Sequence, residues 1–480
     1  MSGHVVTLVV PREHVKRVKT RLESLGILSR SRKIRSTGVA DVVTGFDKFL
    51  IPTTVAVGDE LLGSEWNRHD DTLAKLEMSH NDLQSLELTI ISTHDGDPSA
   101  STGSHLLQRA TKHWLADFPP LFLDGWKSTI DSILASLSPR YNIYPPMLLL
   151  PSKTFSGMDW RALFDNITPE QKQNLFRFIA DAANVTHIAI NAPIPLQQLK
   201  MGDLDPINTQ RRPTHLTPLL GDFGSSDPSP SNTSNFATGF WVSSLQNGIT
   251  QIWAPLHTMF SRGNVTEKAR ILHLHSVASA VCDGRSGSRS GSAAVDLYAG
   301  IGYFAFSYVK AGVDMVLCWE VNPWSVEGLR RGAGINGWVV KTFDPQNMSD
   351  TDVLGSKAIS RLLVFHESNE LALQRIEAMR ERLPPIRHVN CGLLPTACAS
   401  VETAVLALDP DWGGWMHFHE NIALEDIDVR AAEVVVQVQK ILGAAPHDRR
   451  AVLEHIERVK TFAPGVIHCV LDIHVLGIAA

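Results

Sequence analysis

The chain has few cysteines, no long apolar run and no recognisable targeting segment. Its five cysteines are scattered and form no CxxC pair, which argues against both a disulfide framework and a cysteine-based zinc site. No apolar run reaches the roughly 18 residues that a membrane-spanning helix needs, and the first residues lack the charged-then-apolar order of a secretory signal. We therefore expect reduced thiols, a cytoplasmic location and no membrane partner.

A strong excess of charge of one sign is also missing. The formal net charge is −6, and 20% of the 480 residues are charged, which is ordinary for a globular protein and argues against one that coats nucleic acid. Positive charge is nevertheless concentrated locally, since residues 1–40 contain nine lysines and arginines but only two glutamates. This basic segment could contact phosphates, or it could be the solvated face of a helix.

The length favours about three domains. We expect an N-terminal basic α/β module with a polar connection over residues 1–104, a middle α/β domain over residues 105–275 and a catalytic domain over residues 276–480. Within the first module, residues 5–10 are predicted to form a strand and residues 11–25 a helix.

Local signals predict several individual elements. A capping box at Thr168, with proline at the next position, predicts a helix that ends at Ala183. The pair Asn247-Gly248 predicts a β-hairpin. The serine- and glycine-rich residues 279–293 are expected to be a surface linker, and the polar residues 64–104 a connection.

Residues 295–337 organise the chain, because they show the order strand, glycine turn, helix, strand and helix. Gly300 and Gly302 follow a short apolar strand, where they allow a sharp turn and the close approach of a ligand. The next predicted strand, residues 315–319, ends at Glu320, which could accept hydrogen bonds from ribose hydroxyls. The pattern predicts a nucleotide pocket in an α/β, Rossmann-like sheet.

More strands and a helix are predicted after this unit. A helix is expected over residues 422–442. The further strands, which would complete a sheet of about seven, are predicted at residues 361–365, 387–394, 413–421 and 468–477.

Two cofactors compete for the predicted pocket. The residues from Gly300 to Ala305 satisfy the loose dinucleotide pattern GxGxx(G/A), but that match alone is weak. Asp296 precedes the first glycine and would place a carboxylate beside the pyrophosphate of NAD, where like charges repel. S-adenosylmethionine carries an ammonium and a sulfonium instead, so Asp296 and Glu320 favour it over NAD. Alternatively, residues 295–337 could be a strand-helix-strand unit whose glycines are incidental and which binds no cofactor.

Two histidines lie on one face of a predicted strand. His417 and His419 could suggest a metal site, but no third ligand is near in sequence and no HExxH helix is present. We therefore expect no metal. The chain also lacks an obvious catalytic triad or cysteine-histidine pair.

The stretches DLYAGIGYF and CWEVNPWSVEGLRRGAGINGW resemble the cofactor domain of the tRNA wybutosine-synthesising protein 2 family, the aminocarboxypropyltransferases related to the tRNA guanine-N1 methyltransferases. The resemblance continues at residues 247–271, 387–396 and 413–421, and before about residue 180 it is confined to patches. It implies a C-terminal Rossmann-like class I methyltransferase sheet preceded by smaller α/β domains.

The resemblance also implies a reaction and its partners. S-adenosylmethionine would donate its 3-amino-3-carboxypropyl group to carbon 7 of 4-demethylwyosine in tRNA(Phe), a step of wybutosine biosynthesis that releases 5′-methylthioadenosine. The tRNA would bind through its anticodon arm, and a monomer is expected. Because the sulfonium is already activated, the site would act mainly by orienting the reactants.

Residue by residue, the resemblance assigns cofactor contacts to the following positions: Ser261, Lys268, Asp296, Tyr298, Gly300, Gly302, Glu320, Asn322, Ser368 and Asn369. A hydroxyl at Ser261 and an ammonium at Lys268 suit the α-carboxylate of the methionine portion, although the residues alone favour a helix cap and a surface lysine. Asn369 matches the end of the loop that contacts adenine in the family, whereas Ser368 departs from the usual aspartate.

Asn390 occupies the position of the asparagine in the NPPY-type motif of related amino-methyltransferases. Here the sequence is NCGLLP, without the two prolines and the aromatic ring. Asn390 could position a flipped base, or it could be a buried asparagine that bonds its own backbone.

Three alternative functions stay open. The first is a methyltransferase of the same fold. The second is a catalytically silent tRNA-binding homologue, for which an insertion at residues 339–360 and Ser368 give slight support, and the third, more distant, is an NAD oxidoreductase.

Overall fold

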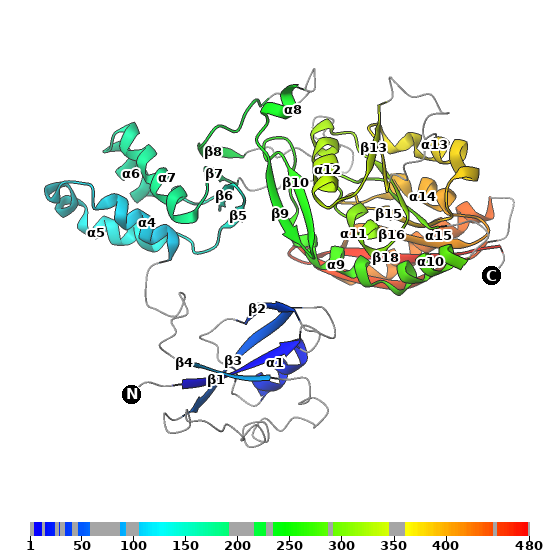
Figure 1. The fold of residues 1–480 in the computed structure, drawn as a ribbon, viewed down its shortest axis with the longest axis horizontal. Coiled ribbons are helices and arrows are strands. Elements are labelled where there is room, and N and C mark those ends of the chain that lie inside the picture. The colour runs from blue at the N-terminus through cyan, green and yellow to red at the C-terminus, as the bar shows by residue number, and fades with distance from the viewer. Residues whose placement is uncertain are drawn as a thin grey trace. The chain divides into compact units, whose positions relative to one another are not determined.

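The computed structural model describes residues 4–11, 15–24, 28, 34–40, 47–57, 87–92, 105–191, 216–226, 234–286, 291–344, 361–444 and 449–478. The chain divides into two compact units, residues 1–109 and residues 110–480 (Figure 1). The division falls within helix α4 (Leu106–Leu115). Each unit is described by itself below.

Among its described residues, the first unit has an antiparallel sheet against which helix α1 (Val15–Ser24) packs. The strand order is β2-β3-β1-β4. Leu8 and Val10 of the first strand pack with Val18 and Leu22 of the helix, as the apolar spacing of that helix requires. The four strands are β1 (His4–Pro11), β2 (Arg35–Ala40), β3 (Asp47–Val57) and β4 (Glu87–Ser92).

Three predictions for this unit have definite outcomes. The strand over residues 5–10 is confirmed, and the helix over residues 11–25 is confirmed with a later start. The connection predicted over residues 64–104 is wrong at residues 87–92, which form β4 and pair with β1. This short apolar stretch lies between polar residues and was not recognised as a strand. Most of the basic segment lies outside the described residues.

A second, four-stranded sheet opens the larger unit, with the order β5-β6-β7-β8. Thr168 and Gln171 form the expected capping box, since each side chain binds the backbone of the other, at 2.8 and 3.1 Å. The helix that they start ends at Ala183, as predicted. The elements are β5 (Asn142–Tyr144), β6 (Met147–Leu150), β7 (His187–Ile190), β8 (Thr217–Leu220), α5 (Pro120–Ser136), α6 (Met158–Asp165) and α7 (Pro169–Ala183).

The predicted hairpin at Asn247-Gly248 is confirmed. It joins β9 (Val242–Gln246) to β10 (Ile249–Trp253). Both turn residues have positive φ, 54° and 67°, as a two-residue hairpin turn demands. The short helices before and after it are α8 (Ser234–Thr238), η4 (Arg262–Asn264) and α9 (Val265–His273).

Helix α10 (His275–Ser286) overturns the linker expected at residues 279–293. Ala280 and Val281 are buried, and Val277 and Val281 pack in the core that α11 shares. The other faces of this helix carry small and polar residues. Their abundance makes the segment resemble a linker, although its apolar residues have helical spacing. The prediction is therefore wrong for the residues that α10 contains.

The largest sheet has eight strands in the order β13-β14-β12-β11-β15-β16-β18-β17. The pairs from β13 to β16 are parallel, and those that involve β18 are antiparallel. The strands are β11 (Ala293–Asp296), β12 (Met315–Trp319), β13 (Val340–Phe343), β14 (Leu362–Phe365), β15 (Ile386–Cys391), β16 (Gly413–Ala423), β17 (Ala451–Ala463) and β18 (Val466–Leu476).

Helices cover both faces of this sheet (Figure 1). One apolar core joins the sheet to α13, α14 and α15, and another joins it to α10, α11 and α12. This three-layer arrangement confirms the predicted α/β, Rossmann-like class. The helices are α11 (Ala305–Ala311), α12 (Pro323–Ile335), α13 (Ala372–Met379), α14 (Val401–Ala407) and α15 (Ile427–Gly443).

Three details of the sheet differ from the sequence predictions. The count of about seven strands is too low, because β17, whose side chains are mostly half-buried or exposed, was not recognised. The segment at residues 339–360, expected to be an insertion relative to the family, begins with a strand that was not predicted, β13, which pairs with β14, and residues 345–360 lie outside the description. The helix expected over residues 422–442 begins later, because β16 continues to Ala423.

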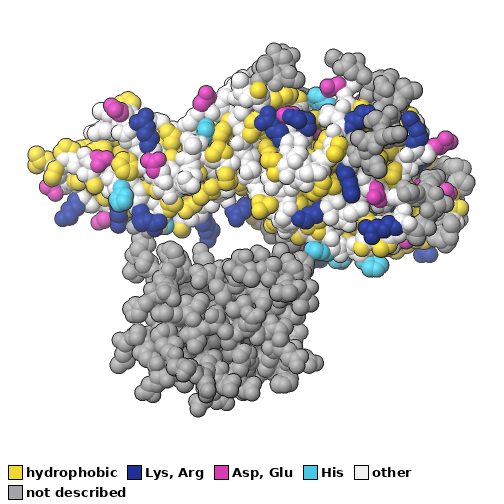
Figure 2. Space-filling model, in the orientation of Figure 1, with side chains coloured by type: hydrophobic (Ala, Val, Ile, Leu, Met, Phe, Trp, Pro, Cys, Tyr) yellow, Lys and Arg dark blue, Asp and Glu magenta, His cyan; other side chains and the backbone are white. Residues whose placement is uncertain are grey.

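The surface of the larger unit mixes charges. On the face shown in Figure 2, its lysine and arginine side chains are interspersed with acidic and apolar ones. In the part of the chain that the structure describes, no helix combines the length and the apolar character that crossing a membrane demands.

Candidate functional site

The predicted cofactor residues gather where the parallel strands end. Asp296 is the last residue of β11, and it is fully buried. Its Oδ1 accepts hydrogen bonds from Asn390 Nδ2, at 3.1 Å, and from the backbone N–H of Tyr298, at 3.3 Å. Within the described residues its Oδ2 has no hydrogen-bond partner. Burial raises the pKa of Asp296 to about 6, and the hydrogen bonds with Asn390 and the backbone oppose that rise.

The loop after β11 depends on two glycines. Gly300 and Gly302 have φ angles of 54° and 85°, a region that residues with a Cβ rarely occupy. A Cβ at Gly302 would also lie 2.6 Å from the ring of Phe306. The turn therefore requires glycine at this position, as predicted.

Glu320 follows β12 and faces this loop. Its two carboxylate oxygens accept from the backbone N–H groups of Gly300, at 2.8 Å, and of Asn322, at 2.7 Å. Burial raises the pKa of Glu320 to about 7, and the charge of Asp296 adds to the rise. The arrangement fixes a carboxylate at the strand end, where a ribose would be bound in folds of this class.

Asn322 supports Glu320 rather than facing the loop with its side chain. Its Oδ1 accepts from the backbone N–H of Trp324, at 2.9 Å, and so caps α12. Its Nδ2 donates to the carbonyl of His257, at 3.0 Å. The side chain is therefore fully engaged, and the contribution of Asn322 to the site is the backbone N–H that binds Glu320.

The loop after β14 brings Ser368 and Asn369 to the same edge. Asn369 Nδ2 donates to the carbonyl of Leu297, at 2.9 Å, one residue after Asp296. Ser368 accepts from the backbone N–H of Glu370, at 3.3 Å, and caps a short 3₁₀ turn. Tyr298 lies partly buried against the core beside them. The structure thus brings these three predicted residues to the end of β11.

Lys268 of α9 is buried, which contradicts the interpretation as a surface lysine. Its Nζ donates to Gln246 Oε1, at 2.5 Å, and to Gln251 Oε1, at 2.8 Å. It also lies over the rings of Phe260 and Tyr303, at 5.3 and 5.6 Å from their centres. No carboxylate in the described chain pairs with it, and burial lowers its pKa to about 7. A buried cation held only by neutral groups is suited to an anionic ligand.

Three residues that the sequence analysis missed connect these parts. The hydroxyl of Tyr303 donates to the carbonyl of Met259 and accepts from the backbone N–H of Ser261, at 3.3 Å. Gln251, besides accepting from Lys268, donates to the carbonyl of Gly302, at 3.3 Å. Lys460 of β17 donates to Ser261 Oγ, at 3.5 Å. Only the position of Tyr303 directly after Gly302 was a usable signal.

Asn390 is fully buried behind Asp296. Its Nδ2 donates to Asp296, and its Oδ1 lies 3.3 Å from His419 Nε2. A flipped base could engage this amide only by replacing one of the two bonds. A role for Asn390 in positioning the base therefore stays a prediction.

The histidines of β16 have partners on the neighbouring strands. His417 lies 3.0 Å from His388 and 2.7 Å from Asp472, and His419 lies 3.1 Å from His468. Throughout the described ranges, no group of three or more His, Cys, Asp or Glu side chains is arranged to hold a metal ion.

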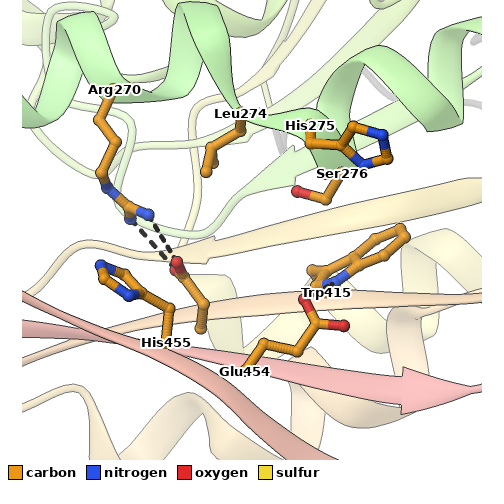
Figure 3. A pocket seen from close by; sticks show the side chains of 8 residues that line it. Arg270, Leu274, His275, Ser276, Trp415, Glu454 and His455 are labelled. Carbon is orange, nitrogen blue, oxygen red and sulfur yellow. Dashed lines mark hydrogen bonds and ion pairs between the residues drawn. The ribbon is translucent and has the colours of Figure 1, made fainter.

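A cavity of about 450 Å³ lies elsewhere on the larger unit (Figure 3). None of the predicted cofactor residues lines it. Arg270, on its wall, binds both Glu267, at 2.7 Å, and Asp472, at 2.5 Å. The pair with Asp472 joins α9 to β18, and thereby helps to position Lys268 two residues earlier in the helix.

The chain is similar to curated proteins of one kind. Over 335 residues it is 40% identical to the tRNA wybutosine-synthesizing protein 2 of Schizosaccharomyces pombe. The match covers 70% of this chain and 72% of that protein. It is 28% identical to the protein of the same name from Saccharomyces cerevisiae, over 98% of this chain and 97% of the relative. No family model matches the chain.

Solved structures resemble the chain more distantly. TYW2 of Pyrococcus horikoshii, in complex with MeSAdo, is 16% identical over 77% of this chain and 99% of its own, with a TM-score of 0.46. Trm5b of Pyrococcus abyssi is 14% identical over 98% of this chain and 99% of its own, with a TM-score of 0.42.

Proposed function

Because the chain belongs to the tRNA wybutosine-synthesizing protein 2 family, we propose that it transfers the 3-amino-3-carboxypropyl group of S-adenosylmethionine to carbon 7 of 4-demethylwyosine in tRNA(Phe). The family predicted from the sequence is confirmed, and the chain is accordingly a transferase of tRNA modification. S-adenosylmethionine supplies an electrophilic γ-carbon, which bonds to carbon 7 as the carbon-sulfur bond breaks, so that 5′-methylthioadenosine and the proton of carbon 7 are released.

One observation carries the proposal, namely a buried cation and a buried carboxylate on either side of the same glycine loop. Lys268 has no acidic partner among the described residues, and Oδ2 of Asp296 has no donor. The ammonium of Lys268 suits the α-carboxylate of a methionine tail, and the carboxylate of Asp296 suits its cationic groups. Tyr303 and Gln251 tie the cation to the loop, so the two charges are held as one unit.

The remaining residues would hold the other parts of the cofactor. We propose that Glu320 accepts from the ribose hydroxyls, with Asn322 as its support. The backbone of Gly300 and Gly302 would border the bound cofactor, and Ser261 would assist Lys268. Tyr298, Ser368 and Asn369 would line the adenine end. The two carboxylates beside the loop argue against NAD, whose pyrophosphate they would repel.

The partners follow from the same proposal. We propose that tRNA binds through its anticodon arm to a monomer in the cytoplasm, and that the chain works as three parts over residues 1–104, 105–275 and 276–480. Support for a tRNA substrate comes from family membership and from the basic segment near the N-terminus.

The identity of the released nucleoside tests the reaction. The protein is incubated with S-adenosylmethionine and tRNA(Phe) that carries 4-demethylwyosine, and the products are identified by mass spectrometry. We expect 5′-methylthioadenosine, because anchoring the amino acid tail at Lys268 presents the γ-carbon instead of the methyl group. S-adenosylhomocysteine with a methylated base would indicate a methyltransferase. Binding of both substrates without turnover would indicate the silent homologue.

The basic segment can be tested separately from the cofactor site. Replacing Arg30, Arg32, Lys33 and Arg35 by glutamine should weaken tRNA binding and flatten its dependence on salt, by about one unit of slope for each lost phosphate contact. Electrophoretic shift assays at several salt concentrations measure both quantities, and calorimetry with S-adenosylmethionine should show no change. An unaltered slope would mean that these residues are a solvated surface without a role in tRNA binding.

A further inference from the structure

A row of buried polar side chains crosses the large sheet behind Asp296. It runs from Asp296 on β11 through Asn390 on β15 and His419 on β16 to His468 on β18, which are adjacent strands in that order. All four side chains are at most 1% exposed. The proposed function uses Asp296, but it leaves the two histidines without a role.

The hydrogen bonds of this row have one direction. An ionised carboxylate only accepts, so the Nδ2 of Asn390 donates to Asp296, at 3.1 Å. The Oδ1 of Asn390 therefore faces His419 and must accept from its Nε2, at 3.3 Å. A neutral imidazole that donates from Nε2 accepts at Nδ1, so His468 donates to His419, at 3.1 Å. Every donor thus points toward Asp296.

We propose that His419 is a positioning residue, which acts through Asn390 to keep Asp296 ionised and oriented for the cofactor. The inference rests on the proposed function. Without a donor at His419, the Asn390 amide is free to turn and present its oxygen to the carboxylate, which would then lose its donor and meet a second acceptor. Because successive hydrogen bonds polarise one another in a buried site, His468 strengthens the same effect.

The protonation of the row agrees with this direction. Burial, together with His468, holds the pKa of His419 well below its usual range, and burial lowers the pKa of His468 to about 4. Both rings are thus neutral at physiological pH. Titratable or charged groups face the row from every side. They are Glu320, Tyr308, Cys318 and Cys391 near Asp296, His417, Arg270 and Asp472 near His419, and Lys460 near His468.

A neighbouring row on the same sheet provides a matched control. His388 is 1% exposed and lies beside His417, which is bonded to Asp472. This row contains buried histidines on β15 and β16 as well, but it ends in the Arg270 ion pair and makes no hydrogen bond with Asp296. Substituting His388 therefore perturbs a comparable core position without touching the proposed chain.

The test measures how the affinity for S-adenosylmethionine depends on pH. Calorimetry from pH 5 to 7.5 is performed in a Glu320→Gln background, so that Asp296 is the carboxyl of the pocket that still titrates, while Lys268, whose pKa is about 7, titrates alike in every variant compared. Binding should weaken as the pH falls through about 6, the pKa of Asp296. His419→Leu should move this midpoint upward by about one unit, which lowers the affinity about fivefold at pH 6 and about tenfold at pH 5. His419→Gln, whose amide can still donate to Asn390, should restore the midpoint, and His388→Leu should leave it unchanged.

Other outcomes would overturn the inference. An unshifted midpoint in His419→Leu, or an equal loss of affinity at every pH, would mean that His419 only fills the core. If circular dichroism shows that His419→Leu does not fold, His468→Leu replaces it, and it should shift the midpoint in the same direction by a smaller amount. No shift in that variant would also overturn the inference. Asp296→Asn distinguishes the two proposals, because unchanged affinity in that variant would reject the cofactor site itself.

Discussion

Replacing Lys268 by methionine is expected to weaken the binding of S-adenosylmethionine about 100-fold and, at the same time, to stabilise the fold. The loss of affinity follows from removing a charge-assisted hydrogen bond to the α-carboxylate in a buried site, which is worth roughly 1.5 to 3 kcal/mol. The gain in stability follows from the absence of an acidic partner in the described chain. Methionine has nearly the same length and no charge to desolvate.

The stability gain has a defined dependence on pH. Burial lowers the pKa of Lys268 to about 7, whereas an unfolded lysine titrates near 10.4. Below about pH 7 the folded protein holds the buried charge at full cost, roughly 3 to 5 kcal/mol. The cost disappears as the pH rises from about 7 to 10. After subtracting the lost hydrogen bonds to Gln246 and Gln251, a net gain of about 1 to 3 kcal/mol should remain at pH 6.

Denaturant unfolding and calorimetry measure the two effects. Lys310→Met is the control, because Lys310 is exposed and donates to the carbonyl of Gly248 on the same hairpin, at 2.8 Å. That variant should change neither affinity nor stability by much. Unchanged cofactor affinity in Lys268→Met would reject the assignment of the cation. A destabilised variant would mean that the two glutamines satisfy the ammonium fully.

Much of the cofactor strand unit could be predicted because its signals are local. Asp296, Gly300, Gly302 and Glu320 occupy the ends and turns of a short repeating unit, where strand, turn and helix preferences agree. The strand Met315–Trp319 was located for the same reason.

The elements that were missed depend on distant partners. Strand β17 is recognisable only from its pairing with β18, and β13 only from its pairing with β14. Helix α10 was hidden because small residues resemble a linker when its buried face is not known. Composition describes a segment by itself, whereas pairing and burial are properties of the whole sheet.

The same distinction separates the site residues that were found from those that were not. Lys460 of β17 contacts Ser261, from which it is far away in the sequence. Gln251 of β10 contacts Lys268 of α9. His419 was considered only as a metal ligand, because its neighbours Asn390 and His468 are brought to it by β15 and β18. Local sequence signals thus predict where the strands end, whereas tertiary packing determines which side chains meet there.

Replacing Glu320 by alanine is expected to weaken S-adenosylmethionine binding by at least about 100-fold. The variant loses the charged acceptor for two ribose hydroxyls, and each such hydrogen bond is worth roughly 1.5 to 3 kcal/mol. It also releases the backbone N–H groups of Gly300 and Asn322, which Glu320 holds at 2.8 and 2.7 Å. The turn that carries the glycines should therefore loosen, and the effect should exceed that of Glu320→Gln, which keeps one acceptor.

The pH dependence of binding separates Glu320 from Asp296. Because burial raises the pKa of Glu320 to about 7, the affinity advantage of the unaltered protein over Glu320→Ala should shrink as the pH drops below about 7, when protonation removes an acceptor. Lys268, whose pKa is also about 7, titrates in both proteins, and a second step near pH 6, the pKa of Asp296, should appear in both. Glu327→Ala is the control, since Glu327 pairs with Arg330 and Arg331 within α12, at 2.7 Å each. Calorimetry across this range measures both steps, and unchanged affinity with both steps intact in Glu320→Ala would place the ribose elsewhere.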